Sequence, residues 1–247
     1  MKKQYLALLA SALVASGCSG GSGGAASSSA NSSGSMNMED GPAFPVNAGF
    51  ETSDLSGWSI VFGDAYDDDS VSSVSTFSFS SDERHQEIPV NQTGNWYLSG
   101  KGYDGKRSFT RTGAIQSSSF VLASDGVLSM KLAGGALAKS KGANADMKSE
   151  ESVCYVGVYL SSNDQMIARQ TNEYFLEHEE SYVNVNQYKN GVYNTDNFVE
   201  YTLDLSKYAG KSVYLKIVDN DKSDYYGYLS VDDIRNGASS APQEEGA

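Results

Sequence analysis

The chain has 247 residues, a formal net charge of −13 and a sequence pI near 4.5. An acidic chain of this kind excludes charge-driven binding to nucleic acid or to an anionic lipid surface, because both are themselves negative. Sixteen tyrosines, nine phenylalanines and 25 glycines, without sustained helical periodicity, favour many short strands over long helices. We therefore expect a mainly β protein with neutral partners.

The N-terminus has the pattern of an export signal. Lys2 and Lys3 precede an apolar run, Tyr5 to Ala15, that is too short to span a bilayer as a stable helix. The run leads into Leu13 to Cys18 (LVASGC), which resembles the lipoprotein box of bacterial envelope proteins. That resemblance implies removal of residues 1–17, lipidation of Cys18 and a membrane anchor of several acyl chains. The alternative is an ordinary secretory signal with an incidental cysteine.

Two segments lack the composition of a folded core. Residues 18–44 are mostly Ser, Gly, Ala and Asn, and this composition cannot bury enough apolar surface to offset the loss of chain entropy. We interpret them as a tether on the cell envelope, and residues 236–247 as a loose tail. Residues 45–235 then form one domain. With Cys18 lipidated, Cys154 has no disulfide partner, and its apolar surroundings predict a buried thiol.

Short β-type runs separated by turn signals recur through this domain. The predicted strands are Trp58–Phe62, Ser70–Ser75, Asn95–Ser99, Gly113–Gln116, Ser119–Leu122, Val127–Leu132, Val153–Leu160, Met166–Gln170 and Phe198–Leu203. We interpret Phe77–Gln92 and Ala136–Ser152 as long connections and Asn190-Gly191 as a tight hairpin turn. The pattern predicts an all-β fold, a two-sheet antiparallel β-sandwich of jelly-roll type.

The last strands add a second kind of signal. Val213–Val218 and Tyr228–Ile234 flank an acidic turn and predict a hairpin. In the second strand Asp232 and Asp233 are adjacent, so one carboxylate points toward the buried face whichever face that is. A buried carboxylate needs hydrogen bonds or a cation.

Five segments of the domain occur in the order found in one family. They are Asn47–Trp58 (NAGFETSDLSGW), Gly63–Ser73, Gly113–Phe120 (GAIQSSSF), Leu128–Gly135 (LSMKLAGG) and Val218–Arg235 (VDNDKSDYYGYLSVDDIR). The arrangement resembles the galactose-binding-like β-sandwich modules that accompany glycoside hydrolase family 32 enzymes. This resemblance implies carbohydrate binding without catalysis. It also implies a structural Ca²⁺ ion that links the first and last strands, with Glu51, Asp232 and Asp233 at the matching positions.

The chemistry of Ca²⁺ suits these residues, because the ion takes six to eight oxygen ligands from carboxylates, carbonyls and water. The alternative is that Glu51 and one of the two aspartates cap turns or face solvent. A second acidic set, Asp219, Asp221 and Ser223, starts like an EF-hand loop but lacks the glycine and the final glutamate that such a loop requires. We interpret it as a solvated turn.

A sugar site needs aromatic rings for the C–H side of the sugar and planar polar groups for its hydroxyls. The candidate ligand-binding residues are Tyr225, Tyr226, Trp96, Tyr103, Asp64, Asp104 and Arg107. Tyr225 and Tyr226 are the leading pair, because paired aromatics in a loop are seldom needed for packing. Sheet packing is the alternative for each aromatic residue, and Trp58 is expected in the core.

Two other classes of function stay open. An enzyme would need placed carboxylates or a nucleophile motif, and Gly-x-Ser-x-Gly, His-Glu-x-x-His and Cys-x-x-Cys are all missing from the sequence. An adhesive or structural surface protein could use the same sandwich to bind another protein. We expect a non-catalytic, monomeric, carbohydrate-binding lipoprotein, with neutral fructan- or galactose-type glycans as ligands.

Overall fold

The computed structural model describes residues 38–81, 84–102, 110–134, 154–172, 197–222 and 228–238, with residues 77–81 and 84–88 described by their backbone alone. These residues form two antiparallel sheets and a separate hairpin, with two short 3-10 turns, η1 (Asp68–Ser70) and η3 (Ser206–Tyr208). No helix within these ranges is long and apolar enough to cross a lipid bilayer.

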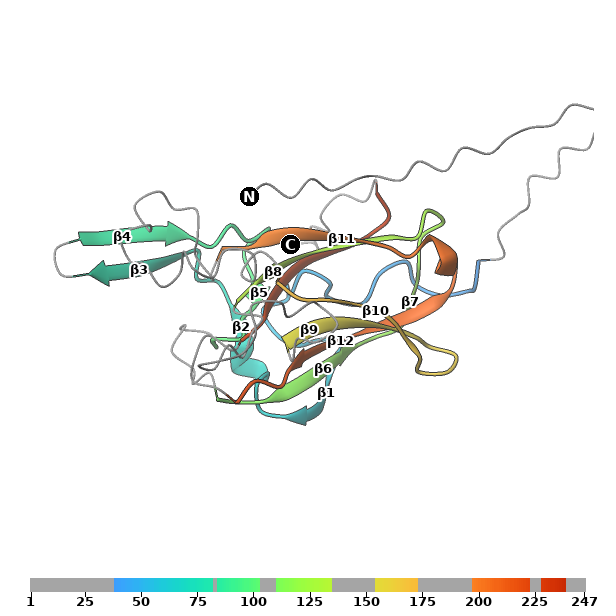
Figure 1. The fold of residues 1–247 in the computed structure, drawn as a ribbon, viewed down its shortest axis with the longest axis horizontal. Coiled ribbons are helices and arrows are strands. Elements are labelled where there is room, and N and C mark those ends of the chain that lie inside the picture. The colour runs from blue at the N-terminus through green and yellow to red at the C-terminus, as the bar shows by residue number, and fades with distance from the viewer. Residues whose placement is uncertain are drawn as a thin grey trace, which may run out of the picture. The chain divides into compact units, whose positions relative to one another are not determined.

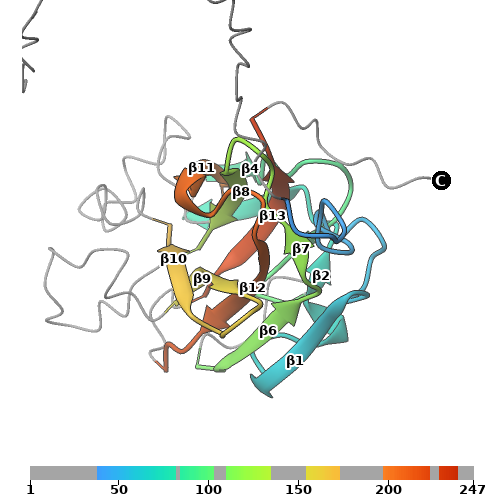
Figure 2. The ribbon, with the colours of Figure 1, turned by 90° about the vertical axis from the view of Figure 1, so that its right-hand side faces the viewer.

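The first sheet, called sheet A, has β12 at its centre. Its strands in spatial order are β1 (Trp58–Gly63), β6 (Gly113–Ser117), β12 (Ser212–Asp219), β9 (Cys154–Leu160) and β10 (Met166–Gln170), and β7 (Phe120–Val121) pairs with the start of β12. Figure 2 shows these strands side by side with β1 and β10 at the two edges.

The second sheet, sheet B, lies against sheet A. Its strands in order are β11 (Val199–Asp204), β8 (Val127–Ala133), β13 (Ser230–Asn236), β5 (Tyr97–Leu98) and β2 (Val71–Ser72) (Figure 1). Leu132 and Val231 of sheet B share one buried core with Leu215 and Val156 of sheet A. The predicted all-β, two-sheet antiparallel sandwich is confirmed.

The core follows from the two-residue period of the strands. In β12, Val213, Leu215 and Ile217 are fully buried, while the residues between them turn to the outer face of sheet A. In β9, Cys154 is also fully buried, as the sequence predicted. The inward residues of both strands pack against sheet B in the shared core, which explains why they are all apolar or small.

The prediction that the last two strands form a hairpin was wrong. β12 pairs with β6, β7 and β9, whereas β13 pairs with β8 and β5 in the other sheet. Both strands are apolar enough to lie inside a sheet, and the segment between Asp219 and Ser230 is long enough to pass from one sheet to the other. The final strands therefore join the two layers.

The interpretation of Phe77–Gln92 as a connection was also wrong. The segment contains a hairpin of β3 (Thr76–Ser81) and β4 (Arg84–Pro89), which extends away from the two sheets in Figure 1. Its signal is the alternation of Phe77 and Phe79 with serines, which has the strand period. Residues 136–152 and the Asn190-Gly191 turn lie outside the described residues.

The segment just before Pro45 contacts the strands. The Glu39 amide donates to the Gly210 carbonyl (2.8 Å), and the Glu39 carboxylate accepts from the Ser212 amide (2.8 Å) and pairs with Lys211 (3.2 Å). The Pro42 carbonyl accepts from the Val121 amide (2.7 Å). Residues 39–42, which the sequence placed in the tether, thus lie along β7 and β12.

Candidate functional site

Two acidic residues of β13 hold the loop that follows β4. The Asp232 side chain is fully buried, and its Oδ2 accepts from the Thr93 amide at 2.6 Å while its Oδ1 accepts from the Asp233 amide at 2.7 Å. Burial raises the pKa of Asp232 to about 7, although both hydrogen bonds favour the charged form. The sequence predicted that a carboxylate here would be buried and need partners, and Asp232 is. The face is not the predicted one: Val231 and Ile234 take the core positions, and the register shift between Asp232 and Arg235 leaves both carboxylates beneath the loop that follows β4.

Two cations balance this pair of aspartates. Lys131 Nζ donates to Thr93 Oγ1 (2.6 Å), which itself donates to Asp233 Oδ2 (3.0 Å). Arg235 Nη2 lies 3.2 Å from the same Asp233 oxygen and 2.9 Å from Glu200 Oε1. The carboxylates are therefore part of a continuous polar network that joins β8, β11 and β13.

Glu51 holds the other end of the same loop. Its carboxylate accepts from the backbone amides of Asn95 (3.0 Å to Oε2) and Trp96 (3.2 Å to Oε1). Gly94 has a φ of +68°, and a Cβ there would collide with Glu51 Oε1, so only glycine fits beside this carboxylate. We call Glu51, Thr93, Asp232, Asp233, Lys131 and Arg235 the terminal cluster.

The backbone around the terminal cluster is unusual. Five of the six non-glycine residues with positive φ in the described ranges lie in the segments that meet here: Asn47, Phe50, Ser53, Asn91 and Asp233. Such conformations cost free energy and persist only where the surroundings hold them. Trp58 is part of the buried core, as expected, and it supports residues 47–50. Its ring stacks on Phe50 (centroids 5.2 Å apart), and its Nε1 donates to the Asn47 carbonyl at 3.2 Å.

Calcium remains a prediction at this place. The oxygen donors of Glu51, Asp232 and Asp233 suit a hard cation, and a cation would offset the burial of Asp232. However, Glu51 and the aspartates bind opposite ends of residues 93–96, and the described residues hold no group of three acidic, His or Cys side chains placed to bind one metal ion. In the structure these carboxylates accept from the loop at residues 93–96 and from the Asp233 amide, and Asp233 also pairs with Arg235.

Two of the predicted ligand-binding residues, Trp96 and Asp64, lie within the described residues. Trp96 is half-buried against the core beside the terminal cluster. Asp64 is exposed after β1, where Arg111 Nε lies 3.9 Å from its carboxylate. Cys18, Tyr103, Asp104, Arg107, Tyr225 and Tyr226 lie outside the described residues.

The acidic turn after β12 corrects another prediction. Asp219 and Asp221 are both almost fully buried, so this part of the turn is not solvated. Cys154 Sγ donates to Asp219 Oδ1 (3.2 Å), and the Asp221 amide donates to the same oxygen (3.2 Å). Burial raises the pKa of Asp219 to about 7. Asp219 is buried because it is the last residue of β12 and pairs with Cys154 of β9.

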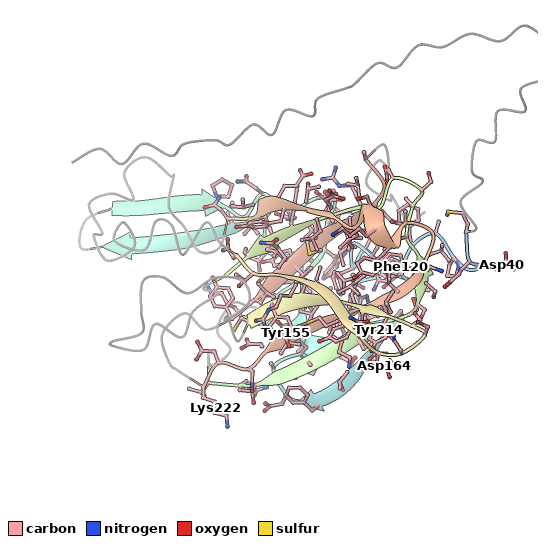
Figure 3. All side chains as sticks on the ribbon, turned by 45° about the vertical axis from the view of Figure 1, so that its right-hand side comes forward. Asp40, Phe120, Tyr155, Asp164, Tyr214 and Lys222 are labelled. Carbon is pink, nitrogen blue, oxygen red and sulfur yellow. The ribbon has the colours of Figure 1, made fainter. Side chains whose placement is uncertain are left out.

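A set of side chains that the sequence did not single out lies on the outer face of sheet A. Tyr155 and Tyr159 of β9 alternate with buried core residues and so turn away from the core. Tyr214 of β12 is directly opposite Tyr159, and Lys216 is opposite Gly157. Figure 3 shows Tyr155 and Tyr214 in the same region of the molecule. We call Tyr155, Tyr159, Tyr214, Lys216 and the neighbouring Arg169 of β10 the tyrosine face.

The rings and cations of the tyrosine face hold one another. Tyr159 and Tyr214 stack with centroids 5.3 Å apart and planes 6° apart. Lys216 Nζ lies 4.8 Å and 5.5 Å from these two centroids, and the Arg169 guanidinium lies 3.8 Å from that of Tyr155. Such contacts attract a cation to the ring face. The face is thus ordered before any ligand arrives.

Gly157 makes this arrangement possible. A Cβ on Gly157 would lie 2.7 Å from Tyr159 Cε2 and 3.2 Å from Tyr155 Cε2, so the rings lean over the bare backbone between them. Burial, helped by the neighbouring tyrosines, raises the pKa of Tyr159 to about 12. Burial and the hydrogen bond that its hydroxyl donates to Asp164 Oδ1 (2.9 Å) raise the pKa of Tyr214 to about 12. Both phenols are therefore neutral at physiological pH.

Comparison with known proteins adds no further assignment. No protein-family model, curated protein or solved structure matches the chain. A β-sandwich by itself supports many functions, so the function has to follow from the side chains. Within the part of the chain that the structure describes, the terminal cluster and the tyrosine face bring charged and aromatic side chains together.

Proposed function

We propose that the protein is a non-catalytic carbohydrate-binding lipoprotein, tethered to the cell envelope through Cys18, with neutral fructan- or galactose-type glycans as ligands. The observation that supports this proposal is the tyrosine face, which offers phenol hydroxyls, a lysine ammonium and aromatic rings on the outer side of a sheet. The hydroxyls of a sugar can form hydrogen bonds with such polar groups, and the C–H surface of a sugar can pack against such rings.

Binding at this face would use the tops of the rings. Tyr214 is buried beneath this face and supports Tyr159 by stacking, so a sugar would meet the partly exposed Tyr155, Tyr159 and Lys216. Because the rings are already stacked, little side-chain freedom is lost on binding. A shallow site of this kind leaves a small surplus of free energy, and we expect a Kd on the order of 10 µM to 1 mM.

The charges of the molecule favour neutral glycans. A net charge of −13 repels sulfated and uronic-acid polymers, and the two cations of the tyrosine face are held by the rings rather than projecting as a basic patch. Hydrolysis of a glycoside needs two carboxyl groups that flank the scissile bond. The described residues around the tyrosine face include one such group, the Asp164 carboxylate, which accepts a hydrogen bond from Tyr214. A single carboxylate held in this way supports binding over catalysis.

The tether is tested by cell fractionation. Cys18→Ser removes the only acceptor for the lipid, so the variant should be released from the membrane fraction as soluble protein. Continued partitioning of this variant into detergent would contradict the lipoprotein assignment.

The ligand class is tested on the full-length chain with a panel of polysaccharides. We expect measurable binding to neutral fructans or galactans and weaker binding to sulfated and uronic-acid polymers. The number of reducing ends in a bound glycan should stay unchanged after long incubation. Binding to no neutral glycan would contradict the proposal and favour an adhesive role. Release of reducing ends from a bound glycan would indicate an enzyme.

A further inference from the structure

The margin of sheet A formed by β1 carries an exposed apolar surface. Val46, Ile60, Val61 and Phe62 are each 46% to 56% exposed, and they are four of the six large hydrophobic residues that are exposed in the described ranges. Val46 also belongs to this surface, because its side chain packs against Gly57, just before β1. A Cβ on Gly57 would lie only 2.5 Å from Val46 Cβ. We call these four residues the β1 patch. Ile60 and Val61 are adjacent in the strand and turn to opposite faces, so the patch wraps around the edge of β1. Exposed apolar surface at an edge is a candidate interaction site.

The β1 patch lies on the edge of the sheet. β1 pairs with β6 on one side, and no described strand pairs with its other side. Edge strands are usually protected by proline, by lysine or by an inward charge, and the sequence WSIVFG has none of these. The register shifts between Ile60 and Phe62, which bends the strand and interrupts a regular ladder. A partner would therefore meet this edge mainly through side chains.

A pocket opens beside the patch. It has a volume of about 420 Å³ and is lined by Asp54, Leu55, Ser56, Trp58, Ile60 and Asp68. Leu55, Trp58 and Ile60 can contact an alkyl chain here, and the carboxylates of Asp54 and Asp68 suit a cationic group at the end of that chain. Hydrogen bonds from Thr52 and Ser56 lower the pKa of Asp54, so this carboxylate is charged at neutral pH.

The charges around the patch select the partner. Asp64, Asp67, Asp68 and Asp69 follow β1 directly, and Arg111 pairs with Asp64 and Asp67 at 3.9 Å and 3.7 Å. A second copy of the chain would bring the same carboxylates against these, and like charges across an interface cost free energy. A basic partner gains from them instead.

We propose that the β1 patch docks an extended segment of another protein in which apolar residues flank a lysine or arginine, and that this basic side chain enters the pocket between Asp54 and Asp68. The apolar residues cover Ile60, Val61 and Phe62. This role is independent of glycan binding, because the tyrosine face lies on β9, β10 and β12, away from the β1 edge.

Two synthetic peptides of alternating valine and threonine, one with a central arginine and one with a central glutamate, test this proposal on the full-length chain. Fluorescence anisotropy should show binding of the arginine peptide and at least tenfold weaker binding of the glutamate peptide. Ile60→Thr and Asp68→Asn should each weaken the arginine peptide about tenfold. Met166→Thr, at the opposite edge of sheet A and also exposed, should leave it unchanged. Val61→Thr replaces Ile60→Thr if that variant does not fold.

Three results would overturn the proposal. The first is no binding of the arginine peptide at about 1 mM. The second is equal affinity for both peptides, or an affinity that the β1 variants do not change. The third is self-association in sedimentation equilibrium that Ile60→Thr abolishes, which would assign the patch to a second copy. Loss of glycan binding with retained peptide binding would affect only the glycan proposal.

Discussion

The terminal cluster and the tyrosine face both hold charged groups close to other side chains, but by different means. In the terminal cluster, fully buried Asp232 accepts hydrogen bonds of 2.6 Å and 2.7 Å. On the tyrosine face, Lys216 lies 4.8 Å and 5.5 Å from two ring centroids. Short hydrogen bonds depend steeply on distance and angle, whereas a ring attracts a cation over a broad area. The cluster therefore tolerates little change, whereas the face tolerates small shifts of its cations while the rings stay stacked.

Removal of Asp232 should have the largest effect. Asp232→Ala leaves the Thr93 amide without its buried acceptor and Lys131 next to an incomplete network, so we expect a loss of about 3–5 kcal/mol in the free energy of unfolding. Asp232→Asn keeps one acceptor oxygen and should lose less. Urea denaturation measures both, with exposed Asp69→Ala as a control that changes stability by less than about 0.5 kcal/mol. A change below about 1 kcal/mol in the free energy of unfolding for Asp232→Ala would show that the cluster tolerates the loss of this carboxylate.

Asp219 provides the second test, since it is buried like Asp232 but without a cationic partner among the described residues. Its folded-state pKa of about 7 lies above the model-compound value of 3.8. The stability that it contributes is complete below pH 4 and is lost as the pH rises through 7. Between pH 5 and pH 8 we expect a loss of about 2–3 kcal/mol.

Thermal unfolding of the wild type and Asp219→Asn across this pH range isolates the contribution. Asparagine does not titrate, so the variant should show a flatter curve and a higher melting temperature than the wild type at pH 8. Parallel curves for the two proteins would mean that Asp219 is not the titrating group.

Chelation should have a somewhat smaller effect. If Glu51, Asp232 and Asp233 hold calcium, free ion at about 30 times its Kd stabilises the fold by about 2 kcal/mol, and excess chelator removes that stabilisation. Differential scanning calorimetry of protein that contains calcium beforehand measures the shift. An unchanged transition would leave loop capping as the whole role of these carboxylates.

The sequence predicted the layers of the fold well because alternation reports directly on burial. Met166–Gln170 was predicted with the bounds that the structure has. The adjacent pair Asp232 and Asp233 was predicted to need partners on the same grounds, and it has them. Alternation alone did not give their side of the sheet, because a register shift in β13 places Val231 and Ile234 in the core and both carboxylates outside it. Sheet membership could not be predicted this way: β12 and β13 both read as strands, but alternation does not say which strand each will pair with.

The tyrosine face was missed for a related reason. Tyr155, Gly157 and Tyr159 alternate on one strand with residues that are also apolar, so alternation alone does not say which set faces the core. Tyr214 and Lys216 come from a strand far along the chain, and only the register of β9 with β12 brings them opposite Tyr159 and Gly157. Asp219 was misread because its burial depends on Cys154, which the same register places beside it.

Removal of hydroxyls from the tyrosine face should have the smallest effect on stability. Tyr155→Phe and Tyr159→Phe keep the rings and their contacts with Arg169 and Lys216, so the free energy of unfolding should change by less than about 1 kcal/mol. Thermal unfolding checks this expectation. A larger loss would mean that these hydroxyls mainly serve packing.

The affinity of this double variant for the neutral glycan bound by the wild type tests the central claim most directly. Isothermal titration should show binding weakened at least tenfold for Tyr155→Phe/Tyr159→Phe and unchanged for Tyr208→Phe, a tyrosine on η3 outside the face. Wild-type affinity in the double variant, together with loss of binding in Tyr225→Ala/Tyr226→Ala, would contradict the claim and assign glycan binding to the loop before β13.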